Sequence, residues 1–166
     1  MLAPYKVLQI KNIQTNGIIN ITDFITSKNI FSEEQKLKQG DIIIVITGAT
    51  IGKVGLWNNR EEFYLGGDMV KFYCREEVVP YFIQSFLLSD IGQLQILRNI
   101  TGATNKHLAP SDIERIKIPL PPLSFQNNIA NEVKRRMHKA KQLQEEAKKV
   151  LEEAKLKVER IILGEE

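Results

Sequence analysis

The sequence predicts an α+β fold, in which a domain of small mixed sheets is followed by a long C-terminal coiled-coil helix. The chain changes character at 119–122, where three of the four residues are proline. Before this proline-rich segment, short β-branched runs alternate with Gly, Asn and Asp clusters, and after it no Gly or Pro occurs until Gly164. Because prolines at this density cannot continue a helix, we expect one domain at 1–123 and a helix at 124–166.

The composition is that of a folded, soluble chain. Its 166 residues are 43% hydrophobic and 26% charged, which excludes intrinsic disorder. No apolar run approaches the roughly 20 residues that a membrane span needs, and no secretory signal is visible at the start, so we expect a cytoplasmic protein without a membrane partner. One cysteine and two histidines allow neither an internal disulfide nor a zinc site. The net charge of +3 permits nucleic-acid binding without requiring it.

Short segments rich in β-branched or aromatic residues, each bounded by turn residues, are predicted to be strands. They are Tyr5–Ile10, Ile18–Thr22, Asp41–Thr47, Lys53–Trp57, Met69–Cys74 and Ile116–Ile118. The third and fourth segments are separated by a short turn that ends at Gly52, so we expect them to pair as a hairpin.

The same domain is expected to hold helices in its second half. Pro80 suits the first position of a helix over about Tyr81–Arg98, because its fixed φ is helical and its missing N–H is not needed there. Phe82, Ile83, Phe86 and Leu87 share one side of that helix. A shorter helix is expected at 111–114, where Ser111 and Glu114 have the spacing of a capping box.

The last quarter of the chain predicts one long helix with Ser124 as its N-cap. About 40 residues of helix would span ~60 Å. Apolar residues recur at spacings of three or four, as in the seam of a coiled coil, and this seam comprises Ile129, Val133, Met137, Ala140, Leu143, Ala147, Val150, Ala154, Val158 and Ile161. Nothing else in the chain is long enough to cover this seam, so we expect a second chain to do so.

A short internal echo lies in the predicted domain. Thr47-Gly48-Ala49-Thr50 recurs as Thr101-Gly102-Ala103-Thr104, with a lysine close to each segment. Two similar glycine turns explain so short a match better than a duplication does. Such loops nevertheless suit a phosphate backbone, because glycine exposes amide N–H groups and lysine supplies positive charge.

Catalytic motifs are absent from the sequence. The segment Gly48–Lys53 has three residues where a P-loop needs four, and Val54 stands where that motif needs Ser or Thr. Neither His107 nor His138 has a nucleophile or carboxylate at a suggestive spacing. Asp41 and Asp68 both follow glycine and are interpreted as turn residues. We therefore expect a chain that is not an enzyme by itself and that holds no metal.

Several motifs together resemble the specificity (S) subunit of type I restriction-modification systems. The first is Leu37-Lys38-Gln39-Gly40-Asp41-Ile42-Ile43. The next two are the echo segments extended at their C-terminal ends, Thr47–Val54 and Thr101–Leu108, and the last is Ile116-Lys117-Ile118-Pro119-Leu120-Pro121-Pro122-Leu123. Their order and spacing resemble one target-recognition domain followed by one spacer helix. The family usually has two of each in one chain, and Phe125-Gln126 stands where it tends to show a Glu-Gln pair.

The resemblance implies a reader of double-stranded DNA that carries no chemistry of its own. In such systems methyltransferase (M) subunits bind S-adenosylmethionine and flip the target adenine, and a restriction (R) subunit that needs ATP and magnesium can join them. This chain would then need no cofactor. With half of the usual length and an uncovered helix, it is expected to form a homodimer through the seam, with the two helices antiparallel.

The resemblance also directs the choice of candidate DNA contacts. The predicted contacts are Lys11, Asn12, Lys28, Thr47, Gly48, Thr50, Lys53, Thr101, Gly102, Thr104, Asn105, Lys106 and His107. Among them, Lys28 and Lys106 are expected to bind phosphates. The alternative is that the Gly-Thr turns only shape the fold.

Two other functions fit the same sequence. The chain could be a recognition fragment of a fused restriction-methyltransferase or a silent recombination cassette, which co-purification with a methyltransferase would test. It could also be a coiled-coil adaptor that binds protein, and such an adaptor should show no salt-dependent binding to duplex DNA.

Overall fold

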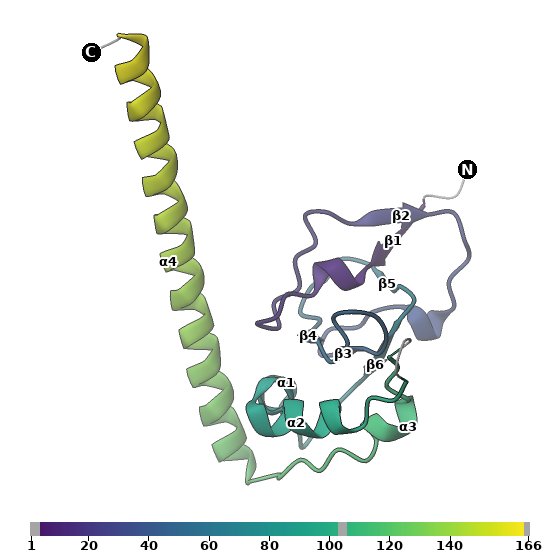
Figure 1. Cartoon of the computed structure of the whole chain (residues 1–166). Coiled ribbons are helices and arrows are strands. Elements are labelled where there is room, and N and C mark those ends of the chain that lie inside the picture. The colour runs from purple at the N-terminus through teal and green to yellow at the C-terminus, as the bar shows by residue number, and fades with distance from the viewer. Residues whose placement is uncertain (1–3, 103–105, 165–166) are drawn as a thin grey trace. The chain divides into compact units, whose positions relative to one another are not determined.

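The computed structural model describes residues 4–102 and 106–164 (Figure 1). The chain divides into two compact units, Met1–Asn127 and Asn128–Glu166. The first unit combines small sheets with short helices, and the second continues a long helix that begins in the first, as the predicted α+β class requires. No helix in the described parts of the chain is long and apolar enough to cross a bilayer.

Two three-stranded sheets form the first unit. One has the order β2-β1-β5, with β1 antiparallel to β2 and parallel to β5. The other has the order β4-β3-β6 and is antiparallel throughout, which confirms the predicted hairpin. The strands are β1 (Tyr5–Leu8), β2 (Ile25–Ser27), β3 (Ile42–Val45), β4 (Val54–Leu56), β5 (Tyr64–Leu65) and β6 (Met69–Phe72), and two 3-10 turns lie at Ile10–Asn12 and Glu33–Gln35.

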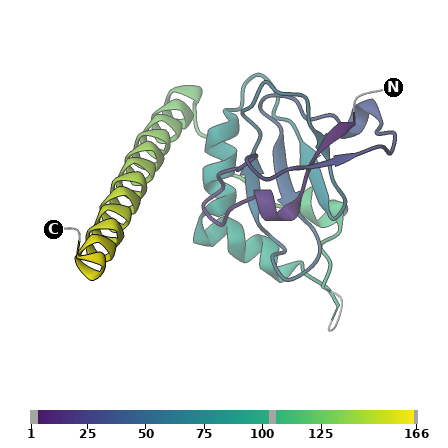
Figure 2. The ribbon, with the colours of Figure 1, turned by 90° about the horizontal axis from the view of Figure 1, so that it is seen from above.

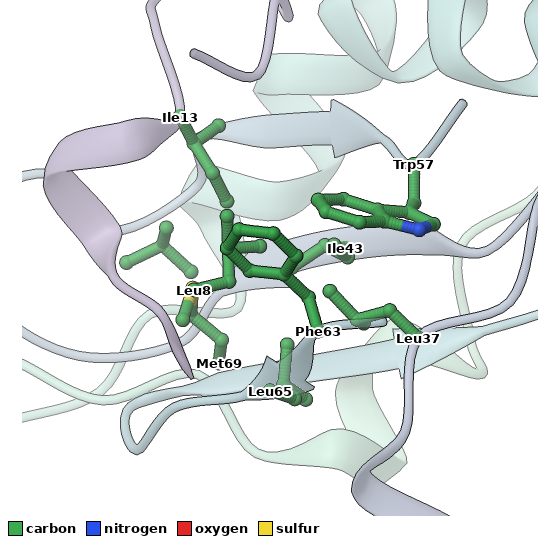
Figure 3. Packing of buried hydrophobic residues seen from close by; sticks show 9 residues of the cluster. Leu8, Ile13, Leu37, Ile43, Trp57, Phe63, Leu65 and Met69 are labelled. Carbon is green, nitrogen blue, oxygen red and sulfur yellow. The ribbon is translucent and has the colours of Figure 1, made fainter. Parts of the chain in front are cut away.

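Strand β3 is buried on both faces. Ile43 and Val45 lie in one hydrophobic cluster, whose residues come mainly from β1, β5 and the segments around them (Figure 3). Trp57 and Phe63 pack against each other within it, with ring centroids 5.1 Å apart and the ring planes tilted by 52°. Ile42 and Ile44 point to the other face and lie in a second cluster. The alternation of side chains along a strand thus places β3 between two apolar layers.

Helices α1 (Pro80–Leu88) and α2 (Asp90–Arg98) form the second layer and lie along one side of the strands (Figure 2). The predicted single helix over 81–98 is therefore wrong, because the chain breaks at Ser89. Ser89 is extended, and its hydroxyl accepts a hydrogen bond from the Gly92 N–H at 3.3 Å as the N-cap of α2. A Cβ at Gly92 would lie 2.1 Å from the Phe86 carbonyl oxygen, so the turn requires glycine.

Two predicted strands are absent, and two short strands were not predicted. Ile19 makes only an isolated bridge to Ile13, and the strand that pairs with β1 lies later, at Ile25–Ser27. Lys117 pairs its backbone with the side-chain amide of Gln95 instead of with a strand, at 2.9 and 3.1 Å. The two-residue strand β5 was not expected either.

The short helix α3 (Pro110–Ile113) starts one residue before the predicted range. Its N-cap is Ala109, which has no side-chain oxygen, and Pro110 occupies the first helical position. The predicted capping box of Ser111 and Glu114 is therefore wrong. The helix starts at Pro110 without a side-chain cap, because the fixed φ of proline favours the first helical position.

Helix α4 (Leu123–Leu163) is a single helix of 41 residues. It begins at Leu123, so Ser124 lies inside the first turn and is not its N-cap; the Pro122 carbonyl accepts from the Phe125 and Gln126 N–H groups at 2.9 and 3.2 Å. The buried Gln126 side chain fixes this start, because its Oε1 accepts from the Val79 N–H at 3.0 Å and its Nε2 donates to the Pro121 carbonyl at 2.9 Å.

Replacing Gln126 by Ala should lower the free energy of unfolding of the first unit by about 1–3 kcal/mol, because the half-buried Val79 N–H loses its acceptor. Chemical denaturation followed by fluorescence of Trp57 measures this change. Gln142→Ala, on the exposed surface of α4, is the matched control and should change stability by less than about 0.5 kcal/mol. Equal stabilities of the two variants would contradict the role given to Gln126.

Candidate nucleic-acid interface

The two echo segments meet in space at His107. Thr47 and Thr101 each form an isolated β-bridge with His107. The His107 N–H donates to the Thr101 carbonyl at 2.9 Å, and the Thr101 N–H donates back to the His107 carbonyl at 3.0 Å. The next residue, Leu108, donates its N–H to the Ile46 carbonyl at 2.9 Å. Two loops that are far apart in sequence therefore form one surface at the end of β3.

The first loop, 47–53, connects β3 to β4, and beyond the bridge of Thr47 to His107 it is anchored at Gly52. Gly52 has a φ of 88°, and the Gln93 side chain on α2 donates to its carbonyl at 3.1 Å. Gly48 has a φ of 81° and is exposed, and a Cβ built on it would meet nothing within 4 Å. The turn around Gly48 is thus open to a ligand, whereas Thr50 and Lys53 are half-buried nearer Gly52.

The second loop presents its polar groups to solvent. Thr101, Gly102, Lys106 and His107 are all exposed, and Gly102 has a φ of 89°. The predicted contacts Thr104 and Asn105 lie outside the described residues. The loop therefore offers a cation, an imidazole and a hydroxyl beside the Gly48 turn.

A third segment, which the sequence did not single out for binding, joins this surface. The Asp68 carbonyl accepts from the Ile46 N–H at 2.9 Å, so the β5–β6 turn lies beside the end of β3. Asp68 is exposed and has a φ of 65°, a conformation that residues other than glycine seldom adopt. The only sequence signal was Gly66-Gly67-Asp68, which was interpreted as a turn.

An open cavity of about 390 Å³ extends from this turn to residues 7–11. Its lining includes Gly66, Gly67 and Asp68 on one side and Gln9 and Lys11 on the other. Lys11 is exposed, and its ammonium group pairs with the Asp23 carboxylate at 2.8 Å. The structure therefore places Lys11 on the same cavity as Asp68.

Asn12 does not belong to this surface, and its predicted DNA contact is corrected. Its side chain is buried, with 3% of the residue exposed. Its Oδ1 accepts from the Gln9 N–H at 2.8 Å, and its Nδ2 donates to the Asn20 and Asp23 carbonyls at 2.9 and 2.8 Å. Every polar atom of the amide is thus used to hold the 3-10 turn at 10–12 and the following loop.

Lys28 lies apart from the loops in the fold. It is exposed and directly follows β2, in the sheet that does not contain β3. Among the described residues, no hydrogen bond or ion pair connects it to the loops at His107. Its role as a phosphate contact stays a prediction.

The predicted seam of helix α4 is exposed from residue 140 on, whereas Val133 and Met137 are half-buried. Leu143, Val150, Val158 and Ile161 are each more than half exposed, and the seam alanines from 140 on are exposed as well. Near the start of the second unit, Arg135 and Arg136 donate to the Glu132 carboxylate at 2.6–2.9 Å. These hydrogen bonds lower the pKa of Glu132 to about 2, so this group is ionised at neutral pH.

Comparison with known proteins identifies related sequences. A sequence model of the type I restriction modification DNA specificity domain matches residues 4–153. The EcoKI specificity subunit of a type I restriction enzyme from Escherichia coli (strain K12) is 28% identical over 131 residues, which cover 76% of this chain. The StySPI specificity subunit from Salmonella potsdam is 27% identical over the same length. The match covers 28% of each of these two relatives.

Solved structures share the fold at low sequence identity. The HsdS subunit from Thermoanaerobacter tengcongensis superposes with a TM-score of 0.65 and 18% identity, covering 85% of this chain and 37% of that one. A chain from a structure of complex assembly and conformational transition in the type I R-M system gives a TM-score of 0.58 and 16% identity, covering 84% of this chain and 32% of that one.

The two neighbouring residues Lys11 and Asn12 should respond differently to truncation. Asn12→Ala should lower the free energy of unfolding by about 1–3 kcal/mol, because three backbone groups lose their partners. Lys11→Ala removes only an exposed ion pair and should cost less than about 1 kcal/mol. Denaturation curves of both variants measure the difference, and an Asn12→Ala variant as stable as the parent would return Asn12 to the candidate DNA contacts.

Proposed function

The chain belongs to the family of type I restriction modification DNA specificity domains, and from this premise we propose that it reads a DNA sequence for a restriction-modification complex. One observation carries the proposal most directly. Two glycine-containing loops and the Asp68 turn converge on the end of β3 and leave their polar groups exposed. A surface of this kind offers donors and acceptors of different types within a small area, which sequence readout requires.

The groups on this surface divide by the part of DNA that suits them. Lys106 and the amides near Gly48 and Gly102 suit phosphate oxygens, because they combine positive charge with donors that no side chain covers. Asp68 suits an exocyclic amino group of cytosine, since a carboxylate only accepts hydrogen bonds. Thr101 and His107 can donate or accept toward base edges. Phosphate contacts would fix the register, and the remaining groups would distinguish bases.

The proposed partners follow from the family and from the curated relatives, which are specificity subunits of type I restriction enzymes. We place the chain in a complex with adenine methyltransferase subunits, which bind S-adenosylmethionine and extrude the target base. A restriction subunit using ATP and magnesium can join that complex. The chain itself would act as a non-catalytic subunit without a cofactor.

The proposed assembly contains two copies of the chain. The curated relatives are more than three times the length of the segment that matches, and in the described part of the chain the seam of α4 is exposed from residue 140 on. A homodimer through α4 would supply a second recognition unit and would cover the seam. Two identical units related by a two-fold axis read identical half-sites on opposite strands, so the target would be an interrupted palindrome.

Lys106→Ala should weaken binding to all duplexes, whatever their sequence, because a phosphate contact carries no sequence information. The slope of log K against log salt should fall by about one. Lys155→Ala, in the distal part of α4, removes the same charge far along the helix and should leave the slope unchanged. Fluorescence anisotropy titrations at several salt concentrations measure both, and an unchanged slope for Lys106→Ala would remove it from the interface.

Mapping of methylated adenines tests the function as a whole. A host that carries the chain together with its methyltransferase should show methylation at a bipartite motif whose two halves are reverse complements, and a host without the chain should lack it. Deletion of Ala140–Glu146 preserves the seven-residue repeat and should shorten the unread gap without changing either half. A protein-binding adaptor would leave methylation unaffected, and an asymmetric motif would contradict the homodimer.

A further inference from the structure

Two residues of opposite charge lie at matching positions beyond a pair of parallel strands. Strands β1 and β5 lie side by side, and Leu8 pairs with Leu65 (Figure 1). Lys11 follows Leu8 by three residues, and Asp68 follows Leu65 by three residues. Because parallel strands end at the same edge of a sheet, the two charged residues come to one place. Both of them line the open cavity of about 390 Å³.

The wall of the cavity that carries Lys11 is held by the buried amide of Asn12. This amide accepts from the Gln9 N–H at 2.8 Å and donates to the Asp23 carbonyl at 2.8 Å, so it fixes the backbone on both sides of the cation. The Lys11 ammonium group also contacts the Asp23 carboxylate at 2.8 Å. An ammonium group has three N–H donors, so Lys11 can donate to a ligand in the cavity while it keeps this contact.

The wall that carries Asp68 is fixed at both ends. The Gly66 N–H donates to the Leu8 carbonyl at 3.0 Å, and a Cβ at Gly66 would collide with that oxygen, so this close approach requires glycine. The Asp68 carbonyl accepts from the Ile46 N–H at 2.9 Å, and its backbone has a left-handed φ of 65°. The Asp68 carboxylate is exposed and, among the described residues, has no hydrogen-bond or ion-pair partner.

An unpartnered carboxylate is unfavourable on a surface that binds a polyanion. Each phosphate near Asp68 repels it, so the residue opposes binding to duplexes in general. It favours binding only where a base offers a hydrogen-bond donor, which in the major groove is the amino group of cytosine or of adenine. A carboxylate here therefore widens the difference in affinity between a correct and an incorrect sequence from both sides.

The second charge of the cavity selects between these two bases. Guanine, the partner of cytosine, presents O6 and N7 as adjacent acceptors, which lysine recognises, whereas in an A·T pair the amino group separates the two acceptors. We propose that the cavity at the ends of β1 and β5 reads one G·C base pair, in which Asp68 accepts from the cytosine amino group and Lys11 donates to guanine. This assignment rests on the proposed function and adds one base pair of the target and the two residues that read it.

The alternative is that Asp68 only shapes the turn. Aspartate and asparagine are the residues that adopt a left-handed conformation most readily after glycine. Asp68→Asn therefore keeps the fold, removes the repulsion of phosphates, and replaces a group that only accepts hydrogen bonds by one that accepts and donates. A role in the turn alone predicts that this variant recognises DNA as the wild type does.

Mapping of methylated adenines, in a host that carries the full-length chain and its methyltransferase, tests the assignment. The wild-type motif should contain a G·C pair that becomes degenerate in Asp68→Asn and, at the same position, in Lys11→Met. In competition between duplexes that differ only at this pair, the wild-type preference of about 5- to 150-fold should fall below ~3-fold in either variant. Glu34→Gln, which removes an exposed carboxylate outside the cavity lining, is the matched control and should leave motif and preference unchanged.

Binding to a duplex that lacks the methylated motif gives a second, independent readout. Asp68→Asn should bind this duplex about 2- to 5-fold more tightly than the wild type at low salt, because a repulsive charge is gone. Glu34→Gln should change the affinity less than ~2-fold. Fluorescence anisotropy titrations measure both, and an affinity of Asp68→Asn equal to that of the wild type would contradict the repulsive role of the carboxylate.

Several results would overturn the assignment while leaving the proposed function in place. They are a chain-dependent motif that neither variant changes, a change at different positions in the two variants, and an A·T pair at the affected position. A Lys11→Met variant that weakens binding to all duplexes without changing the motif would place Lys11 on a phosphate and overturn the pairing with guanine. A host in which no methylation depends on the chain contradicts the proposed function and the assignment together.

Discussion

Burial of β3 on both faces is the constraint on which the first unit depends. Strand β3 lies between two apolar layers and pairs with β4 along one edge and with β6 along the other, so its position is constrained on both faces and on both edges. The residue after the strand, Ile46, still carries a backbone donor and acceptor that need partners. The Asp68 carbonyl and the Leu108 N–H supply them. The candidate interface therefore lies where it does because the backbone at the end of a buried strand draws three segments together.

The sequence predicted those elements whose cause is local. The hairpin of β3 and β4 could be predicted because an apolar run, a glycine turn and a second apolar run follow one another directly. The long helix could also be predicted, since its repeat of apolar residues extends over many helical turns. The break at Ser89 was not predicted, because Ser89 becomes a cap only through the tight approach of Gly92 to α1. Strand β5 is too short to have a pattern of its own and is defined by its pairing with β1.

The candidate site shows the same division between local and long-range causes. Glycine, threonine and lysine in the echo segments indicated loops that suit DNA, but nothing local indicated that His107 bridges both of them. For Asn12, the local sequence led to a wrong prediction. A polar residue beside a lysine was interpreted as a surface contact, whereas its amide satisfies three backbone groups in the interior. Exposure of a polar residue cannot be predicted from its type when nearby backbone groups lack partners.

The alanines of α4 connect assembly to recognition in the proposed dimer. Alanine buries little apolar area, so a seam with alanine at 140, 147 and 154 gains less free energy per residue than one built of leucine. Exposed ion pairs along such a helix pair would add little in physiological salt. A duplex with two half-sites would hold both recognition units at once and would raise the effective concentration of one helix near the other. By linkage, the palindromic site then stabilises the dimer by the same free energy with which dimerisation strengthens binding to that site. If the seam is of modest strength, tight binding to DNA therefore depends on both half-sites at the correct spacing. A stronger seam would let the dimer assemble without DNA.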